Sequence, residues 1–158
     1  MKGVILNNGE KFYTDLKNVF KAINNLQLNY NWLLTNCECY PQNKKYAEIL
    51  SKKFCWLSGE ELTEMVNNEN FQWIWVVLSG FTKDIIFDDV DKHKLPVADG
   101  NERFWQNPVI IQHPLASVEI VSWDGCLTLL ISNEAKIVDL FRSNFKLSKD
   151  LEIYNDEL

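Results

Sequence analysis

Three groups of side chains in this sequence could take part in chemistry. Cys37 and Cys39 form a C-x-C pair, His113 precedes a proline, and a D-D-x-D cluster begins at Asp88. Cysteine pairs bind metals, a histidine can act as a general base near neutral pH, and clustered carboxylates attract cations or basic surfaces. Each group also has an ordinary structural role, and the residues around it help to decide between the two.

The C-x-C pair lies in a predicted strand over residues 30–40, where positions i and i+2 share one face. Both sulfurs could therefore face one metal, but zinc needs about four ligands. The remaining candidates are not paired at ligand spacing: Cys55, Cys126, His93 and His113. A catalytic thiol would need a nearby base and an electropositive environment, and the neighbouring sequence supplies neither. We expect reduced core cysteines, with no metal site and no cofactor.

His113 ends a predicted strand over residues 109–113, close in sequence to an acid-rich segment. His113 could act as a general base in a small-ligand pocket. Trp73 and Trp75, which we expect on one face of a strand, and Trp105 would line that pocket. This hypothesis requires His113 in a concave site within hydrogen-bond reach of a carboxylate. The ordinary alternative is a strand-end histidine whose ring bonds only to the backbone.

A long acidic connection over residues 83–108 has no clear period, although predicted buried strands flank it. Its acids are Asp84, Asp88, Asp89, Asp91, Asp99 and Glu102. They do not match the spacing of an EF-hand loop. Long irregular connections inside domains are usually functional or disordered, and packed acids repel one another unless a basic surface compensates.

Two hypotheses follow for this connection. In the first it docks a basic protein partner, with Trp105 as an aromatic anchor beside Phe104. The predicted partner-binding residues are then Asp88, Asp89, Asp91, Asp99, Glu102 and Trp105. In the second, Ile85 to Phe87 and Trp105 fold back onto the core and the acids are simply solvated. Whether Trp105 is buried or exposed separates the two.

Charge and composition restrict the function classes. The net charge is −6, with +4 on residues 1–57 and −10 on residues 58–158. An acidic chain repels phosphate backbones, so we expect no nucleic-acid partner. The apolar runs are too short for a signal peptide or a membrane span, which predicts a soluble cytoplasmic protein. No phosphate-binding glycine motif occurs.

The elements predict a single α+β domain over residues 1–158, with about four helices and a mixed or mostly antiparallel sheet. Expected strands cover 3–7, 30–40, 54–57, 71–78, 109–113, 117–123 and 126–131, and expected helices cover 10–25, 43–53, 58–68 and 133–145. Phe12 lies on the apolar stripe of the first helix, Ser58 and Glu61 form a capping box, and Asp124-Gly125 predicts a C-terminal hairpin that precedes the last helix. An acidic tail over 146–158 is expected to pack through Leu151, Ile153 and Tyr154.

Four segments together resemble a family of small, single-domain, uncharacterised bacterial proteins. They are NYNWLLTNCECYP (29–41), CWLSGEEL (55–62), FQWIWVVLSGF (71–81) and NPVIIQHPLASVEIVSWDG (107–125). The resemblance covers most of the chain and implies no catalytic residue. In size and charge the chain is also similar to immunity proteins, which neutralise a toxin domain by binding it.

The sequence thus favours a non-catalytic cytoplasmic protein-binding domain of immunity type that docks a basic partner through its acidic connection. The alternative is a ligand binder or small enzyme with a pocket near Trp73, Trp75, Trp105 and His113. Whether the chain catalyses a reaction stays open, and so does its oligomeric state.

Overall fold

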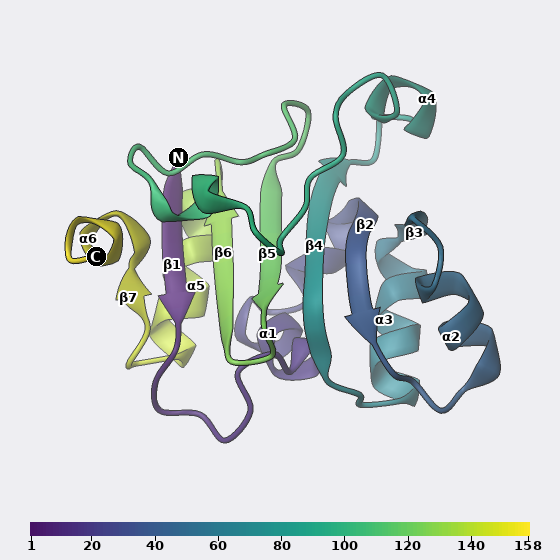
Figure 1. Ribbon diagram of the computed structural model, residues 1–158, viewed down its shortest axis with the longest axis horizontal. Coiled ribbons are helices and arrows are strands. Elements are labelled where there is room, and N and C mark those ends of the chain that lie inside the picture. Colours follow the sequence, from purple (N-terminus) through teal and green to yellow (C-terminus); the bar gives the residue numbers. More distant parts are fainter.

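Seven strands form one open sheet in the order β3-β2-β4-β5-β6-β1-β7, and every neighbouring pair is antiparallel (Figure 1). The computed structural model describes all residues from 1 to 158. The strands are β1 (Lys2–Leu6), β2 (Tyr30–Cys39), β3 (Phe54–Ser58), β4 (Trp73–Thr82), β5 (Val118–Trp123), β6 (Leu127–Ser132) and β7 (Lys149–Asp150). The antiparallel sheet of a single α+β domain is confirmed.

Six α-helices and two 3-10 turns accompany the sheet, more than the four helices predicted. They are α1 (Leu16–Ala22), α2 (Lys44–Leu50), α3 (Gly59–Asn68), α4 (Phe87–Val90), α5 (Ala135–Asn144), α6 (Leu151–Asp156), η1 (Leu26–Asn29) and η2 (Glu102–Trp105). No helix is long and apolar enough to cross a membrane.

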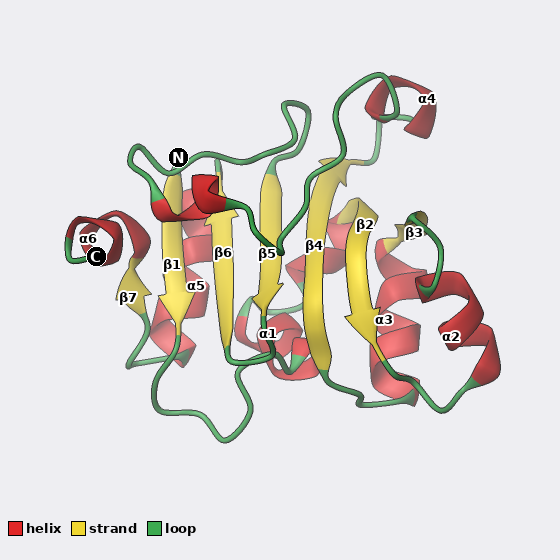
Figure 2. Cartoon of the chain, in the orientation of Figure 1, coloured by secondary structure: helices red, strands yellow, loops and turns green.

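Helices α1, α2, α3 and α5 cover one face of the sheet (Figure 2). Their apolar stripes and the inward residues of the strands make a core cluster of 26 buried residues. The predicted capping box starts α3: the Ser58 hydroxyl accepts from the Glu61 N–H at 3.0 Å, and the Glu61 carboxylate accepts from the Ser58 N–H at 2.7 Å. These two bonds satisfy backbone donors that a helix N-terminus leaves free.

The first helix is shorter than predicted. Asp15 caps α1 by accepting from the Asn18 N–H at 3.2 Å, so residues 10–14 form an irregular segment ahead of the helix. Phe12 therefore leaves the predicted stripe and is 65% exposed. An N-cap side chain that bonds the first turn fixes where a helix begins, whatever apolar residue precedes it.

Two bulges interrupt the pairing of β2 with β4, between Thr35 and Glu38 and between Glu38 and Cys39. Side chains along a strand alternate between the two faces of the sheet. A bulge adds one extra residue to a strand, so the side chains beyond it lie on the opposite face from the one that simple alternation predicts. The second bulge places the extra residue on β4, between Trp75 and Trp73. Trp73 therefore packs in the helix-side cluster and Trp75 packs on the opposite face. The prediction that these two tryptophans share a face is wrong for this reason.

The second face of the sheet is covered by residues 83–117, which connect β4 to β5, and by α6 (Figure 1). We call residues 83–117 the β4–β5 connection. It includes α4 and η2, and its apolar side chains join a second core cluster of 14 buried residues. The sheet is therefore the middle layer between helices and this connection.

Two local predictions on this side need correction. Residues 109–113 do not form a strand, because the N–H groups of Gln112 and His113 bond to a side chain instead of to a neighbouring strand. The hairpin of β5 and β6 forms at Asp124 and Gly125, both with positive φ, and α5 follows it as predicted, but β7 and α6 then extend the chain beyond the predicted last helix. In that tail Leu151 is buried, whereas Ile153 is 61% exposed.

Candidate functional site

The β4–β5 connection has an inner side that belongs to the core. Six of its side chains are buried in the second core cluster: Val90, Ala98, Phe104, Val109, Ile111 and Ala116. Burying a Val, Ile or Phe side chain stabilises the fold by about 1.5–3 kcal/mol, and burying an alanine by less. The inner side is therefore ordered by packing. Of the residues that the second sequence hypothesis names, Ile85, Phe87 and Trp105 pack partly buried against this cluster, whereas Ile86 is 57% exposed.

A buried carboxylate on β5 holds the connection to the sheet. Glu119 is fully buried, and its two oxygens accept from the Gln112 N–H at 2.8 Å, the His113 N–H at 3.0 Å and the Ser79 hydroxyl at 3.1 Å. Burial raises the pKa of Glu119 from 4.5 to about 7, and the three hydrogen bonds partly oppose that rise. A buried carboxyl group without such partners would be strongly destabilising.

His113 continues the same polar cluster toward α4. The side chain is fully buried; its Nδ1 accepts from the Leu115 N–H at 3.2 Å, which leaves Nε2–H to donate to the Val90 carbonyl at 3.2 Å. Burial lowers the pKa of His113, so the neutral ring is favoured. We call Glu119, Ser79 and His113 the buried polar cluster.

A third contact comes from the bulge in β2. Asn36 has a left-handed backbone with φ of 54°, a conformation that asparagine tolerates better than most residues. Its Oδ1 accepts from the N–H groups of Ala98 at 2.9 Å and Asp99 at 3.0 Å. The bulge thus turns a β2 side chain onto the connection, and strands β2 and β5 both hold it.

The C-terminal tail lies against the end of the connection. The Asn107 amide donates to the Glu152 carbonyl at 2.9 Å and to the Asp156 carboxylate at 2.8 Å. Asn155 donates back to the Phe104 carbonyl at 3.3 Å. Two acidic segments that are remote in the sequence are thereby brought side by side.

The outer side of the connection carries the predicted acids. All six are exposed: Asp84, Asp88, Asp89, Asp91, Asp99 and Glu102. Only Asp89 forms an ion pair, with Lys92 at 2.7 Å. Trp105 is half-buried, with its ring centroid 4.8 Å from that of Trp123 and 6.2 Å from that of Tyr154. It is neither a fully buried residue nor a free anchor.

The alternative pocket is not assembled. Trp73 lies on the helix side of the sheet, while Trp75, Trp105 and His113 lie on the other. The ring of His113 bonds to backbone groups only. The ligand-pocket hypothesis requires this ring in a concave site with a hydrogen bond to a carboxylate. The ring is instead fully buried, and the Glu119 carboxylate bonds to the backbone N–H of His113.

Three of the cysteines lie along the helix-side cluster: Cys37, Cys39 and Cys55. Burial raises the pKa of the Cys39 thiol to about 11 and that of Cys55 to about 12, and it raises that of Cys37 as well. A thiol with a raised pKa is a poor nucleophile at neutral pH. No three His, Cys, Asp or Glu side chains are grouped so that they could hold a metal ion.

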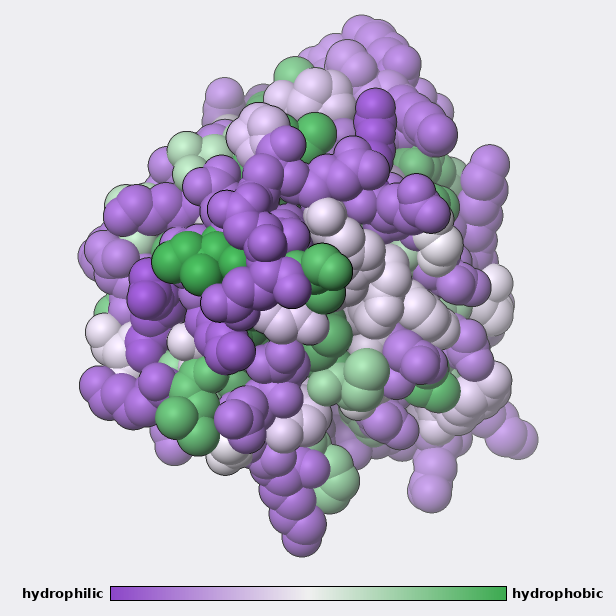
Figure 3. All heavy atoms as spheres, turned by 60° about the vertical axis from the view of Figure 1, so that its left-hand side comes forward, coloured by the Kyte–Doolittle hydropathy of each residue, from purple (hydrophilic) through white to green (hydrophobic).

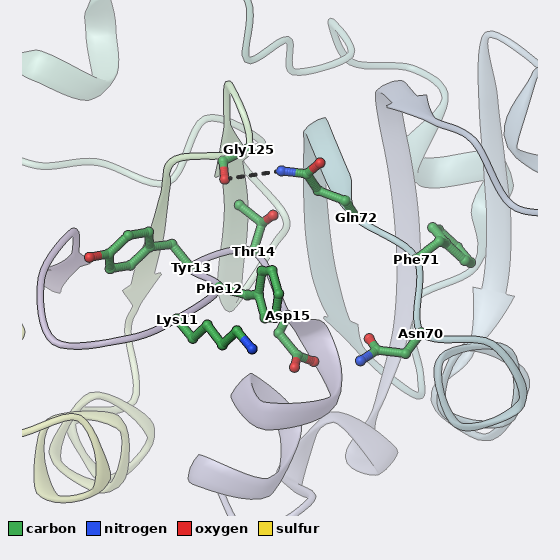
Figure 4. Close-up of a pocket in the computed structure, with 9 residues that line it drawn as sticks. All are labelled: Lys11, Phe12, Tyr13, Thr14, Asp15, Asn70, Phe71, Gln72 and Gly125. Atoms are coloured by element: carbon green, nitrogen blue, oxygen red, sulfur yellow. Dashed lines mark hydrogen bonds between the residues drawn. The ribbon is translucent and has the colours of Figure 1, made fainter.

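A hollow of about 400 Å³ lies between the start of α1, the residues before β4 and the β5–β6 turn (Figure 4). Its aromatic walls are Phe12, Tyr13 and Phe71, and the Gln72 amide points across it to the Gly125 carbonyl at 3.4 Å. Its carboxylate, on Asp15, is already bonded to the first turn of α1. The lining offers no nucleophile with an adjacent base, and sequence reasoning did not find this hollow.

Sequence reasoning also missed Glu119 and Asn36, the two side chains that hold the connection. The sequence does contain a signal for Glu119. In the predicted strand over 117–123 this acid lies on the same face as the apolar residues Val121 and Trp123. A charge at such a position must find partners or neutralise. The sequence contains no such signal for Asn36, because its role depends on a bulge in β2.

Known proteins provide no further guide to this geometry. Comparison of the chain finds no matching family model, no matching curated protein and no matching solved structure.

Proposed function

We propose that this protein is a non-catalytic protein-binding domain, of the kind that immunity proteins represent, which docks a basic partner through the outer side of the β4–β5 connection. The proposal rests on the difference between the inner, apolar side of this segment and its outer, acidic side. Six of its apolar side chains are buried in the core, and its six carboxylates are exposed. A surface that is ordered before binding loses less conformational entropy on association.

The charge of the outer side supports a basic partner. Residues 83–108 contain six acids and four basic residues. One of those cations, Lys83, pairs with Glu60 on α3, and another, Lys92, pairs with Asp89. Exposed carboxylates steer a positively charged partner and raise the association rate at low salt.

The tail enlarges the proposed surface. Glu152, Asp156 and Glu157 on or next to α6 are exposed and lie beside the end of the connection. Figure 3 shows the side of the molecule that includes this tail: hydrophilic residues dominate, and apolar residues form separate patches between them. Non-obligate protein interfaces are about as apolar as the rest of a protein surface, so a mixed surface of this kind is compatible with docking.

The neighbouring gene is the place to look for the partner, because an immunity protein is encoded beside its toxin. We expect the combined change of Asp88, Asp89 and Asp91 to Asn to lower the association rate with that gene's product about tenfold at low salt, and less at physiological salt. Stopped-flow mixing at two ionic strengths measures this.

The control removes the same charge from the helices of the opposite face, by Glu48→Gln, Glu64→Gln and Asp139→Asn together. It should leave the rate almost unchanged. If both triple variants slow association equally, only net charge matters and the proposed docking surface is wrong. An unchanged rate and affinity in the first variant would reject it as well.

A further inference from the structure

The outer side of the β4–β5 connection contains a hollow of about 640 Å³ that is separate from the acids of α4. Its polar lining consists of His93, Lys94, Asn101, Arg103 and Gln112. No carboxylate lines it, although the chain has 22 acidic residues and a net charge of −6. The lining of the hollow is therefore positively charged, in contrast to the protein as a whole.

The cations of the connection are divided between two environments. Lys83 pairs with Glu60 at 3.0 Å and Lys92 with Asp89 at 2.7 Å, and these are the only ion pairs in the chain. Lys94 and Arg103 have no carboxylate partner, and both line the hollow. Unpaired cations that share one hollow repel each other, so an anion placed between them would be stabilised.

The walls of the hollow are held in place. The Asn101 side chain accepts from the Arg103 N–H at 3.2 Å and donates to the Val97 carbonyl at 2.9 Å. The Asn36 side chain on β2 accepts hydrogen bonds from the N–H groups of Ala98 and Asp99 and so fixes this part of the connection. On the far side, the N–H of Gln112 is bonded to buried Glu119. These hydrogen bonds hold the backbone around the hollow, so its polar side chains line a preformed site and not a freely moving loop.

We propose that this hollow binds the phosphoryl group of a small soluble molecule. The planar guanidinium of Arg103 can bond two oxygens of a phosphate, and the Lys94 ammonium supplies a second positive charge. The His93 ring and the amides of Asn101 and Gln112 supply further hydrogen bonds. The volume exceeds that of a phosphate, which leaves room for an organic part of the ligand. This proposal is independent of the protein-binding function.

Titration with pyrophosphate, followed by calorimetry at low salt, tests the site. We expect saturable binding that Arg103→Gln and Lys94→Gln each weaken about tenfold or more, because each removes a charge-assisted contact. Both side chains are exposed, so both variants should fold. Lys83→Gln and Lys92→Gln are matched controls, since they remove equal charge from the same connection outside the hollow.

Three results would overturn the proposal. The first is the lack of saturable pyrophosphate binding by the unmodified protein. The second is equal weakening by the control variants, which would mean that only the general field attracts the anion. The third is tighter binding of citrate than of pyrophosphate, which would replace the phosphoryl group by a carboxylate ligand.

Discussion

Replacing Glu119 by Gln should remove a large pH dependence from the stability of this protein. The pKa of Glu119 is about 7 in the folded state against an ordinary value of 4.5. Between these two pH values the folded state keeps a proton that the unfolded state releases, so this group destabilises the protein as pH rises through the window. A shift of this size corresponds to roughly 3 kcal/mol.

The opposite sign applies to His113, whose pKa is lowered by burial. The unfolded state takes up a proton as pH falls below about 6.5, whereas the folded state does not, so this group destabilises the protein at low pH. The two effects oppose each other in the unmodified chain. The contribution of Glu119 is therefore measured as the difference between the variant and the parent.

Urea unfolding of both proteins between about pH 4.5 and pH 8 gives that difference. The Gln variant cannot accept from both backbone N–H groups, which costs about 1–3 kcal/mol at every pH. Relative to the parent, it should nevertheless gain roughly 3 kcal/mol from the low to the high end of the range. If the difference in unfolding free energy between the two proteins does not change with pH, the raised pKa of Glu119 is wrong. Glu64→Gln, at an exposed site on α3, is the control.

Phe104→Ala should cost about 3–5 kcal/mol of folding free energy, the usual range for an aromatic residue removed from a core. Phe104 is 1% exposed and packs edge-on against Trp123, with ring centroids 6.2 Å apart. Its loss would leave a cavity between the connection and the sheet. The stability of the variant is measured by urea unfolding followed by circular dichroism.

Trp105→Ala is the natural comparison, because the two aromatic residues are adjacent in η2. Trp105 is only half-buried, so its removal should cost clearly less than that of Phe104. A greater cost for Trp105→Ala would mean that the connection is held through Trp105, in conflict with the observed packing. The same variant, once shown to fold, tests Trp105 as an anchor for the partner.

Features that depend on a few consecutive residues were predictable from the sequence. The capping box at Ser58 and Glu61 and the turn at Asp124 and Gly125 both formed where they were predicted. Each depends on backbone conformation and hydrogen bonds within four residues of the chain. The antiparallel sheet followed from the same local signals.

Features that depend on distant residues were not predictable in this way. The segment over 109–113 has the composition of a strand, yet Glu119 takes the backbone N–H groups of Gln112 and His113. Trp73 and Trp75 lie on opposite faces because of the bulge in β4, which no local pattern indicates. Which of Phe104 and Trp105 is buried was decided by the packing of η2 against the sheet.

Glu119 and Asn36 hold the β4–β5 connection as a fixed layer on the sheet. Amide hydrogen exchange of the unmodified protein tests this arrangement most directly. The N–H groups of Ala98, Asp99, Gln112 and His113, all bonded to these two side chains, should exchange as slowly as those of the central strands, by global unfolding. Fast exchange at these four amides, with the strands still protected, would show that the connection is mobile and that Glu119 and Asn36 do not fix it.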